Sequence, residues 1–134
     1  PEAKVIAHEA EAEMLAKPEY NLSKDCCRRE ISMSADIYVK DKETLKVGNM
    51  ELTFIYTPGH TKGGMTIYTD GYLFCGDTLF RMSIGRTDFY GGDFGQLINS
   101  IKDRLFAFPD DTVVLPGHMG ATTIGDEKRG NPFV

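Results

Sequence analysis

Three side chains with metal-binding chemistry each follow a run of strand-forming residues. His60 and His118 both end a Pro-Gly-His turn, and Asp77 follows the apolar run YLFCG. Proline ends a strand ladder and glycine allows an unusual backbone angle, so both imidazoles would be held rigidly at a sheet edge. Each residue alone is explained as turn chemistry. Because the turn occurs twice, the pattern favours a site for zinc, iron or manganese, which imidazole and carboxylate groups bind.

Two hairpins and a later strand would position these ligands. Residues 44–56 read as a hairpin that turns at Gly48-Asn49, and residues 65–76 as a second one that turns at Asp70-Gly71. The run TVVL leads to the second Pro-Gly-His turn. In the strand before Asp77 the side chains alternate between faces, with Leu73 and Cys75 on one face and Phe74 on the other.

A helix is expected between the second hairpin and the last strand. Asp93 and Gln96 have the spacing of a capping box, and Pro109-Asp110-Asp111 would end the helix. Apolar residues recur between them at helical spacing, which predicts a stripe that faces the core: Leu97, Ile98, Ile101, Leu105 and Phe108.

The two ends of the chain are less regular. Residues 5–7 predict a short buried strand, and residues 9–17 a helix that Pro18 ends. Residues 19–40 show no clear period, which predicts a mobile connection with one short helix near residues 23–29. The tail from Thr122 predicts a closing turn or short helix.

The order and spacing of five motifs carry a family resemblance: TPGHTKGG, GDTLF, GRTD, PDDTVVLPGH and TTIGDEKRGNPF. Together they resemble the C-terminal half of metallo-β-lactamase-fold hydrolases, and within them the short glyoxalase II (hydroxyacylglutathione hydrolase) branch. The resemblance implies an α+β fold, part of an αβ/βα sandwich, with residues 1–134 as a single partial domain. Because the whole fold takes about 200 residues, the N-terminal sheet and its H-x-H-x-D-H turn are expected to precede this sequence.

The resemblance also implies roles for individual residues. His60 matches a ligand of a first metal, His118 a ligand of a second, and Asp77 the catalytic carboxylate that bridges the two. Two zinc ions are expected in the complete enzyme, with iron or manganese as alternatives. His8 has no ligand neighbours in the sequence and is expected to be structural.

The loop between Phe80 and Asp93 is rich in glycine, aromatic and basic residues, as binding loops often are. The resemblance places Arg86 near a basic residue that holds the glutathione part of the substrate, with Tyr90 beside it. The alternative is that Arg86 pairs with Asp88 or Asp93 and only shapes the loop.

The residues and the resemblance lead to three alternative hypotheses for the function. The main expectation is metal-dependent hydrolysis of a small-molecule thioester such as S-acylglutathione. A second is a mononuclear iron dioxygenase acting on a persulfide, with His60 and Asp77 at the iron and His118 uncoordinated. The third is an inactive fragment that binds at most one metal, because half of the ligands that the resemblance implies are absent from these 134 residues.

Composition excludes other classes. The net charge is −5 and no Lys/Arg block occurs, which argues against a nucleic-acid surface. No apolar run reaches the ~20 residues of a membrane helix, and no signal peptide is recognised. Three cysteines form no disulfide framework, so reduced thiols and a cytoplasmic location are expected. Without a second sheet, the inner sheet face would expose apolar surface, which predicts self-association as one way of covering it.

Overall fold

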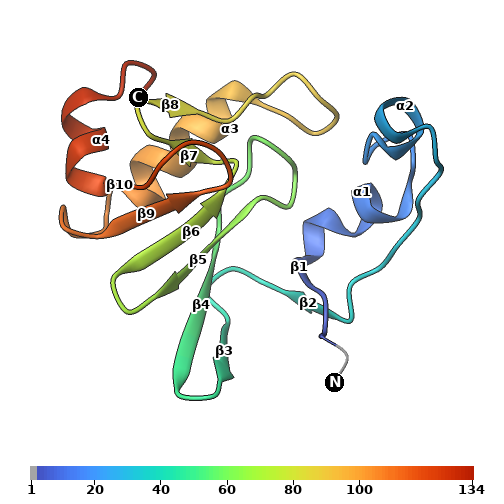
Figure 1. Cartoon of the computed structure of the whole chain (residues 1–134), viewed down its shortest axis with the longest axis horizontal. Coiled ribbons are helices and arrows are strands. Elements are labelled where there is room, and N and C mark those ends of the chain that lie inside the picture. The colour runs from blue at the N-terminus through green and yellow to red at the C-terminus, as the bar shows by residue number, and fades with distance from the viewer. Residues whose placement is uncertain (1–2) are drawn as a thin grey trace.

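The central feature of the computed structural model, which describes residues 3–134, is a six-stranded sheet with the order β10-β9-β6-β5-β4-β3 (Figure 1). Two further pairs, β1-β2 and β7-β8, lie outside it. The strands are β1 Ile6–His8, β2 Ile37–Val39, β3 Thr44–Val47, β4 Met50–Tyr56, β5 Met65–Thr69, β6 Tyr72–Gly76, β7 Leu79–Phe80, β8 Ser83–Ile84, β9 Val113–Pro116 and β10 Thr122–Thr123. The helices are η1 Glu9–Glu11, α1 Ala12–Ala16, α2 Ser23–Cys27, α3 Phe94–Asn99, η2 Ser100–Leu105 and α4 Ile124–Gly130.

Both hairpins form as the sequence predicts. β3 and β4 pair up to Val47 and Met50, which flank the Gly48-Asn49 turn. β5 and β6 pair up to Thr69 and Tyr72. Asp70 and Gly71 between them both have positive φ, as a tight two-residue hairpin turn requires. The last long strand, β9, then pairs in parallel with β6 and so ends at the same edge of the sheet as the Asp77 turn.

The helix α3 and its continuation η2 cover the core face of the sheet. Asp93 accepts a hydrogen bond from the Gln96 N–H at 2.8 Å and so caps α3. The capping box is only half formed, because the Asp93 N–H donates to the Gly59 carbonyl instead. From Ser100 the backbone is π-helical rather than α-helical. The buried core joins this helix to the sheet and α4: Ile55, Leu73, Cys75, Leu79, Leu97, Ile101, Leu105, Val114 and Ile124.

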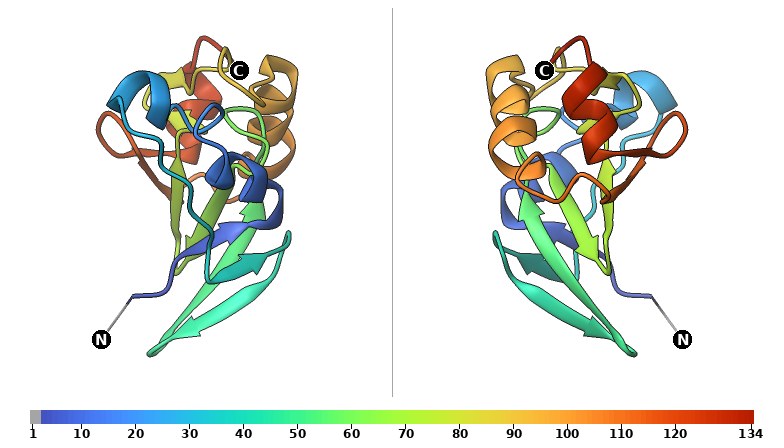
Figure 2. Two further views of the ribbon diagram at one scale, coloured as in Figure 1. Left: turned by 90° about the vertical axis from the view of Figure 1, so that its right-hand side faces the viewer. Right: turned by 90° about the vertical axis from the view of Figure 1, so that its left-hand side faces the viewer.

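The predicted apolar stripe is therefore confirmed, with two of its members at the edge of the core. Leu97, Ile101 and Leu105 are fully buried, whereas Ile98 and Phe108 are half-buried. Phe108 still packs against the core cluster and lies beside the Tyr68 ring. Figure 2 shows α3 standing along one side of the sheet while the β3-β4 hairpin extends away from it.

The N-terminal segment is more ordered than its sequence indicates. Residues 19–40 contain α2, which confirms the short helix predicted near residues 23–29, and also β2, which pairs in parallel with β1 and was not predicted. The expected helix over residues 9–17 divides into η1 and α1. The strands β1 and β2 have three residues each and are far apart in the chain, so no periodic pattern marks them.

The opposite face of the sheet carries exposed apolar side chains. Phe74 and Tyr72 alternate with the buried Leu73 and Cys75, as expected. Val47 and Met50, at the far end of the β3-β4 hairpin, are also exposed. Covering of this face, by self-association or otherwise, stays a prediction. Among residues 3–134, no helix has both the length and the apolar character needed to cross a membrane.

Replacing Ile101 tests the packing of η2 on the sheet. Ile101→Ala should lower the free energy of unfolding by about 2–5 kcal/mol, because it leaves a cavity in the core. Ile98→Ala, one turn away and half-buried, is the matched control and should cost clearly less. Chemical denaturation of both variants gives the comparison, and equal losses would contradict the assigned core face.

Candidate metal centre

The structure brings the three predicted ligands together around the Asp77 carboxylate. His60 Nε2 lies 3.5 Å from Asp77 Oδ2, and His118 Nε2 lies 3.5 Å from Asp77 Oδ1. These separations are too long for a good hydrogen bond. Two ligands on one tetrahedral zinc ion, each about 2.1 Å from the metal, would be about 3.4 Å apart. The spacing thus fits two metal positions that share the carboxylate.

Each of these positions has only two of the ligands discussed here. Within residues 3–134, no three His, Cys, Asp or Glu side chains converge on one metal position. This agrees with the geometry, because His60 and His118 approach different oxygens of Asp77. A zinc site in an enzyme usually has three protein ligands. The residues present therefore fit part of a dinuclear site, and the ligand roles stay a prediction.

Helix α3 and η2 fix the turn that carries His60. The Ser100 hydroxyl donates to the Pro58 carbonyl at 2.7 Å, and the Asp93 N–H donates to the Gly59 carbonyl at 2.8 Å. Gly59 has φ +135, and a Cβ there would lie 2.4 Å from the Leu97 backbone. Only glycine allows this backbone angle and this close contact with the helix.

A backbone carbonyl orients the His60 ring. His60 Nδ1–H donates to the Arg86 carbonyl at 2.7 Å, which leaves Nε2 directed at Asp77. Such a hydrogen bond from the far ring nitrogen fixes the tautomer and orientation of a metal-binding histidine. Gly85, next to this carbonyl, packs so closely that a Cβ there would lie 1.8 Å from the Asp77 carbonyl.

Buried hydroxyl groups link the two strand ends beneath the site. Thr57, which precedes the His60 turn, lies 3.1 Å from the Thr66 hydroxyl and 3.3 Å from the Thr78 hydroxyl. All three residues are buried. Thr78 directly follows Asp77, so this hydrogen-bonded group ties the His60 turn to the Asp77 turn.

A cavity of about 350 Å³ opens beside Asp77 and His60 and reaches the N-terminal segment. Glu11 lies in its wall, where its carboxylate accepts hydrogen bonds from the Thr61 hydroxyl at 3.0 Å and the Gly63 N–H at 2.6 Å. Glu11 therefore holds the loop after His60. His8 also lines the cavity, but its Nδ1 caps η1 and its ring stacks on Tyr56, which agrees with the structural role expected for it.

The structure separates two roles of Arg86. Its guanidinium donates two hydrogen bonds of 2.7 Å to Asp88 and lies over the Phe89 ring. These bonds lower the pKa of Asp88 to about 2. The side chain thus makes the pairing that the sequence offered as the alternative to substrate binding. Its carbonyl, which no sequence pattern identifies, contacts His60.

Tyr90 lies in a cluster that joins this loop to the N-terminal segment. Its hydroxyl donates to Glu13 at 2.9 Å and accepts a hydrogen bond from Lys62, also at 2.9 Å. Its ring stacks on Tyr20 with a centroid distance of 3.7 Å. Tyr20 lines a pocket that also contains His60, so the cluster borders the candidate site.

The cysteines are not among the candidate ligands, although Cys75 lines the cavity beside Asp77. Cys26 and Cys27 are exposed on α2, and Cys75 is buried in β6. Burial raises the pKa of the Cys75 thiol to about 11, and its Sγ–H donates to the Leu79 carbonyl. A neutral, buried thiol is a core group rather than a nucleophile. None of the three cysteines forms a disulfide in the structure.

The fold and the site define a mixed α/β protein with three candidate metal ligands at one edge of its sheet, and the comparisons place it in a family. The family model described as "Metallo-beta-lactamase superfamily" matches residues 2–118. The chain belongs to this superfamily, most of whose members are metal-dependent hydrolases.

Two curated relatives are informative. The hydroxyacylglutathione hydrolase GloC of Haemophilus influenzae is 42% identical over 97 residues, which are 71% of this chain and 46% of that protein. A probable metallo-hydrolase of Streptococcus pyogenes is 38% identical over 135 residues, covering 96% of this chain and 58% of that protein. The chain thus spans about half the length of the curated relatives it matches.

Solved structures confirm the fold. The BLEG-1 B3 metallo-beta-lactamase matches with TM-score 0.89 and 37% identity over 97% of this chain and 64% of that one. TTHA1623 in a di-iron-bound form matches with TM-score 0.79 and 31% identity, over 98% and 65% respectively. ETHE1 from Myxococcus xanthus matches with TM-score 0.71 and 37% identity over 73% and 45%.

The contact between Gly85 and Asp77 gives a direct test of the site. Gly85→Ala should displace the loop, break the bond between His60 and the Arg86 carbonyl, and lower stability by more than about 1 kcal/mol. Gly120→Ala is the control, because nothing lies within 4 Å of a Cβ at Gly120, and it should be neutral within about 0.5 kcal/mol. Thermal unfolding and histidine side-chain NMR report the two effects; a Gly85→Ala protein identical to wild type would refute the contact.

Proposed function

We propose that the protein is a metal-dependent hydrolase of a small-molecule thioester such as an S-acylglutathione. The observation that carries the proposal is the placement of His60 and His118 on opposite oxygens of one carboxylate, each 3.5 Å away. Two zinc ions, or iron or manganese in their place, would be held by these residues together with ligands from elsewhere in the full-length protein. When bound, such a pair lowers the pKa of a water molecule toward neutrality and polarises the carbonyl under attack.

The chain's own groups would hold this site in a fixed geometry. Asp77 would hold the two positions at a fixed separation, because both of its oxygens belong to one rigid carboxylate. The hydrogen bond from His60 Nδ1 to the Arg86 carbonyl would keep Nε2 unprotonated and directed at its metal position. A thiol of pKa about 8.5 can leave as a thiolate without a general acid.

The relatives support this proposal without establishing the substrate. GloC of Haemophilus influenzae, a hydroxyacylglutathione hydrolase, is similar over 71% of the chain. The matching part is less than half of that protein, so the activity of the full-length protein is part of the proposal. In the proposal, Arg86 and Tyr90 contact the thiol carrier of the substrate.

A second candidate is a mononuclear iron dioxygenase acting on a persulfide. The similarity to ETHE1 from Myxococcus xanthus favours it, and so does the exposure of His118, whose side chain is 70% exposed against 25% for His60. In this case His60 and Asp77 would hold one iron and His118 would be free. The distance from His118 Nε2 to Asp77 Oδ1 favours the dinuclear hydrolase.

Replacing Asp77 tests the proposed hydrolase. In the full-length protein, Asp77→Ala should reduce bound zinc from two ions per chain to at most one and lower thioester turnover by at least about 100-fold. Elemental analysis and release of the free thiol give the two readouts. A variant with two ions and full turnover would contradict the assignment. Iron in the wild type together with oxygen uptake would favour the dioxygenase, because a hydrolase consumes no oxygen.

Replacing Arg86 separates its side chain from its carbonyl. Arg86→Ala keeps the carbonyl that contacts His60, so kcat should hold while KM for an anionic thioester rises about tenfold, or about 1.4 kcal/mol. Lys46→Ala removes an exposed positive charge in β3 and is the control for net charge. A fall in kcat with unchanged KM would contradict the proposed role of the guanidinium in ground-state binding of the substrate.

A further inference from the structure

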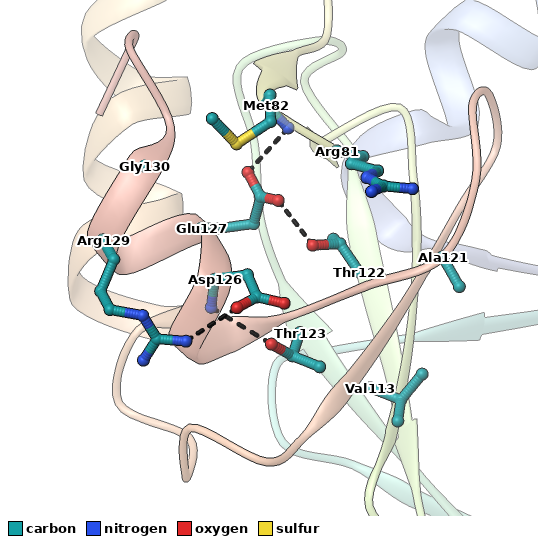
Figure 3. Close-up of a pocket in the computed structure, with 10 residues that line it drawn as sticks. All are labelled: Arg81, Met82, Val113, Ala121, Thr122, Thr123, Asp126, Glu127, Arg129 and Gly130. Carbon is teal, nitrogen blue, oxygen red and sulfur yellow. Dashed lines mark hydrogen bonds and ion pairs between the residues drawn. The ribbon is translucent and has the colours of Figure 1, made fainter.

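A buried carboxylate on α4 is satisfied entirely by neighbouring groups of the chain. Glu127 is 1% exposed, and Figure 3 shows it pointing from the helix toward the β7-β8 turn. Its Oε2 accepts hydrogen bonds from the Met82 N–H at 2.9 Å and from Asn131 Nδ2 at 2.8 Å, and its Oε1 accepts one from the Thr122 hydroxyl at 2.6 Å. Burial of a carboxylate is costly unless such donors surround it.

These contacts hold the β7-β8 hairpin at two successive residues. Besides the bond from Met82 to Glu127, Asn131 Nδ2 donates to the Ser83 carbonyl at 3.0 Å. Met82 has φ 58, in the left-handed region that costs a non-glycine residue roughly 1–2 kcal/mol. The bond to Glu127 offsets this strain and keeps the turn in its observed shape.

The hairpin leads directly to the carbonyl that orients His60. Ile84 pairs with Leu79 in β7, and the Gly85 N–H donates to the Thr78 carbonyl at 3.3 Å. The Arg86 carbonyl, which accepts from His60 Nδ1, follows immediately. Only two residues, Ile84 and Gly85, therefore separate Ser83, held by Asn131, from Arg86, and both have a fixed neighbour.

We infer that Glu127 and Asn131 are positioning residues for His60. Through the β7-β8 hairpin they hold the Arg86 carbonyl where it accepts the His60 Nδ1–H, which keeps Nε2 free to bind a metal. This inference deepens the proposed function and rests on it for its importance to catalysis. The tautomer itself is a property of the metal-free protein and is measured separately.

The neighbouring cavity does not explain why Glu127 is buried. A cavity of about 640 Å³ beside α4 is lined by Arg81, Thr123, Asp126 and Arg129 as well as Glu127 (Figure 3). Asp126 forms an ion pair with Arg129 at 2.7 Å. The Glu127 oxygens already bond to groups of the chain, so they are not directed at a ligand in this cavity.

The test is the tautomer of His60 in the metal-free, full-length protein. Histidine side-chain ¹H–¹⁵N NMR at pH 8, where imidazole is neutral, should show wild-type His60 with the proton on Nδ1. Glu127→Ala should lower this population at least twofold. Glu127→Gln should restore it, because the amide oxygen still accepts from Met82 and Asn131. Asn131→Ala removes the bond to Ser83 and should act like Glu127→Ala, which keeps the test available if one variant does not fold.

Thr122→Val is the matched control. It removes one hydrogen bond from Glu127 without touching the hairpin, so it should lower the melting temperature but leave the His60 tautomer unchanged. If Glu127 and Asn131 had a purely structural role, the tautomer would shift in proportion to the lost stability in every variant, Thr122→Val included. This result would overturn the inference. A wild-type tautomer in both Glu127→Ala and Asn131→Ala would also overturn it. Zinc titration of the wild type tests the proposed function independently, because failure to bind zinc leaves the tautomer result intact.

Discussion

The structure around the site depends on one carboxylate that faces two imidazoles. Asp77 presents one oxygen to His60 and the other to His118, at equal distances of 3.5 Å. Polar side chains held this close without a good hydrogen bond need a rigid frame, because otherwise they would turn toward water or toward each other. The frame is the edge of the sheet at which β4, β6 and β9 all end: β9 pairs with β6, and β5 joins β6 to β4.

That frame combines an apolar core with a small number of polar ties. The core fixes α3 and η2 on the sheet, and this helix holds the Pro58 and Gly59 carbonyls of the His60 turn. The buried hydroxyl group of Thr57 connects this turn to Thr78, next to Asp77. Such short local contacts define distances more tightly than hydrophobic packing alone, which is largely non-directional. The three candidate ligands therefore lie in short turns directly after strand ends, and the loop after β8 contributes the Arg86 carbonyl.

Much of this could be predicted from the sequence because the signals are local. The hairpins follow from Asp70-Gly71 and Gly48-Asn49, and the α3 stripe follows from the spacing of Leu97, Ile101 and Leu105. The repeated Pro-Gly-His turns predicted His60 and His118 as ligands, and the structure places both residues beside Asp77. The parallel pairing of β1 with β2 and the change to a π-helix at Ser100 could not be predicted, because no period marks three-residue strands or a local change in helix type.

Long-range polar contacts were also invisible in the sequence. Glu11 bonds to a loop 50 residues away, and Glu127 bonds to Met82 45 residues away, but each reads only as an acidic residue on a helix. Arg86 illustrates the same limit, because a basic side chain suggests substrate binding, whereas the contact with His60 is made by its carbonyl. Backbone groups carry no residue-type signal, so only a structure identifies them.

The measurement that tests the central claim most directly is anomalous diffraction at the zinc edge from crystals of the zinc-loaded, full-length protein. The account predicts two peaks, each about 2.1 Å from a different oxygen of Asp77, with His60 Nε2 on one metal and His118 Nε2 on the other. A single peak with His118 uncoordinated, or zinc bound away from Asp77, would contradict it.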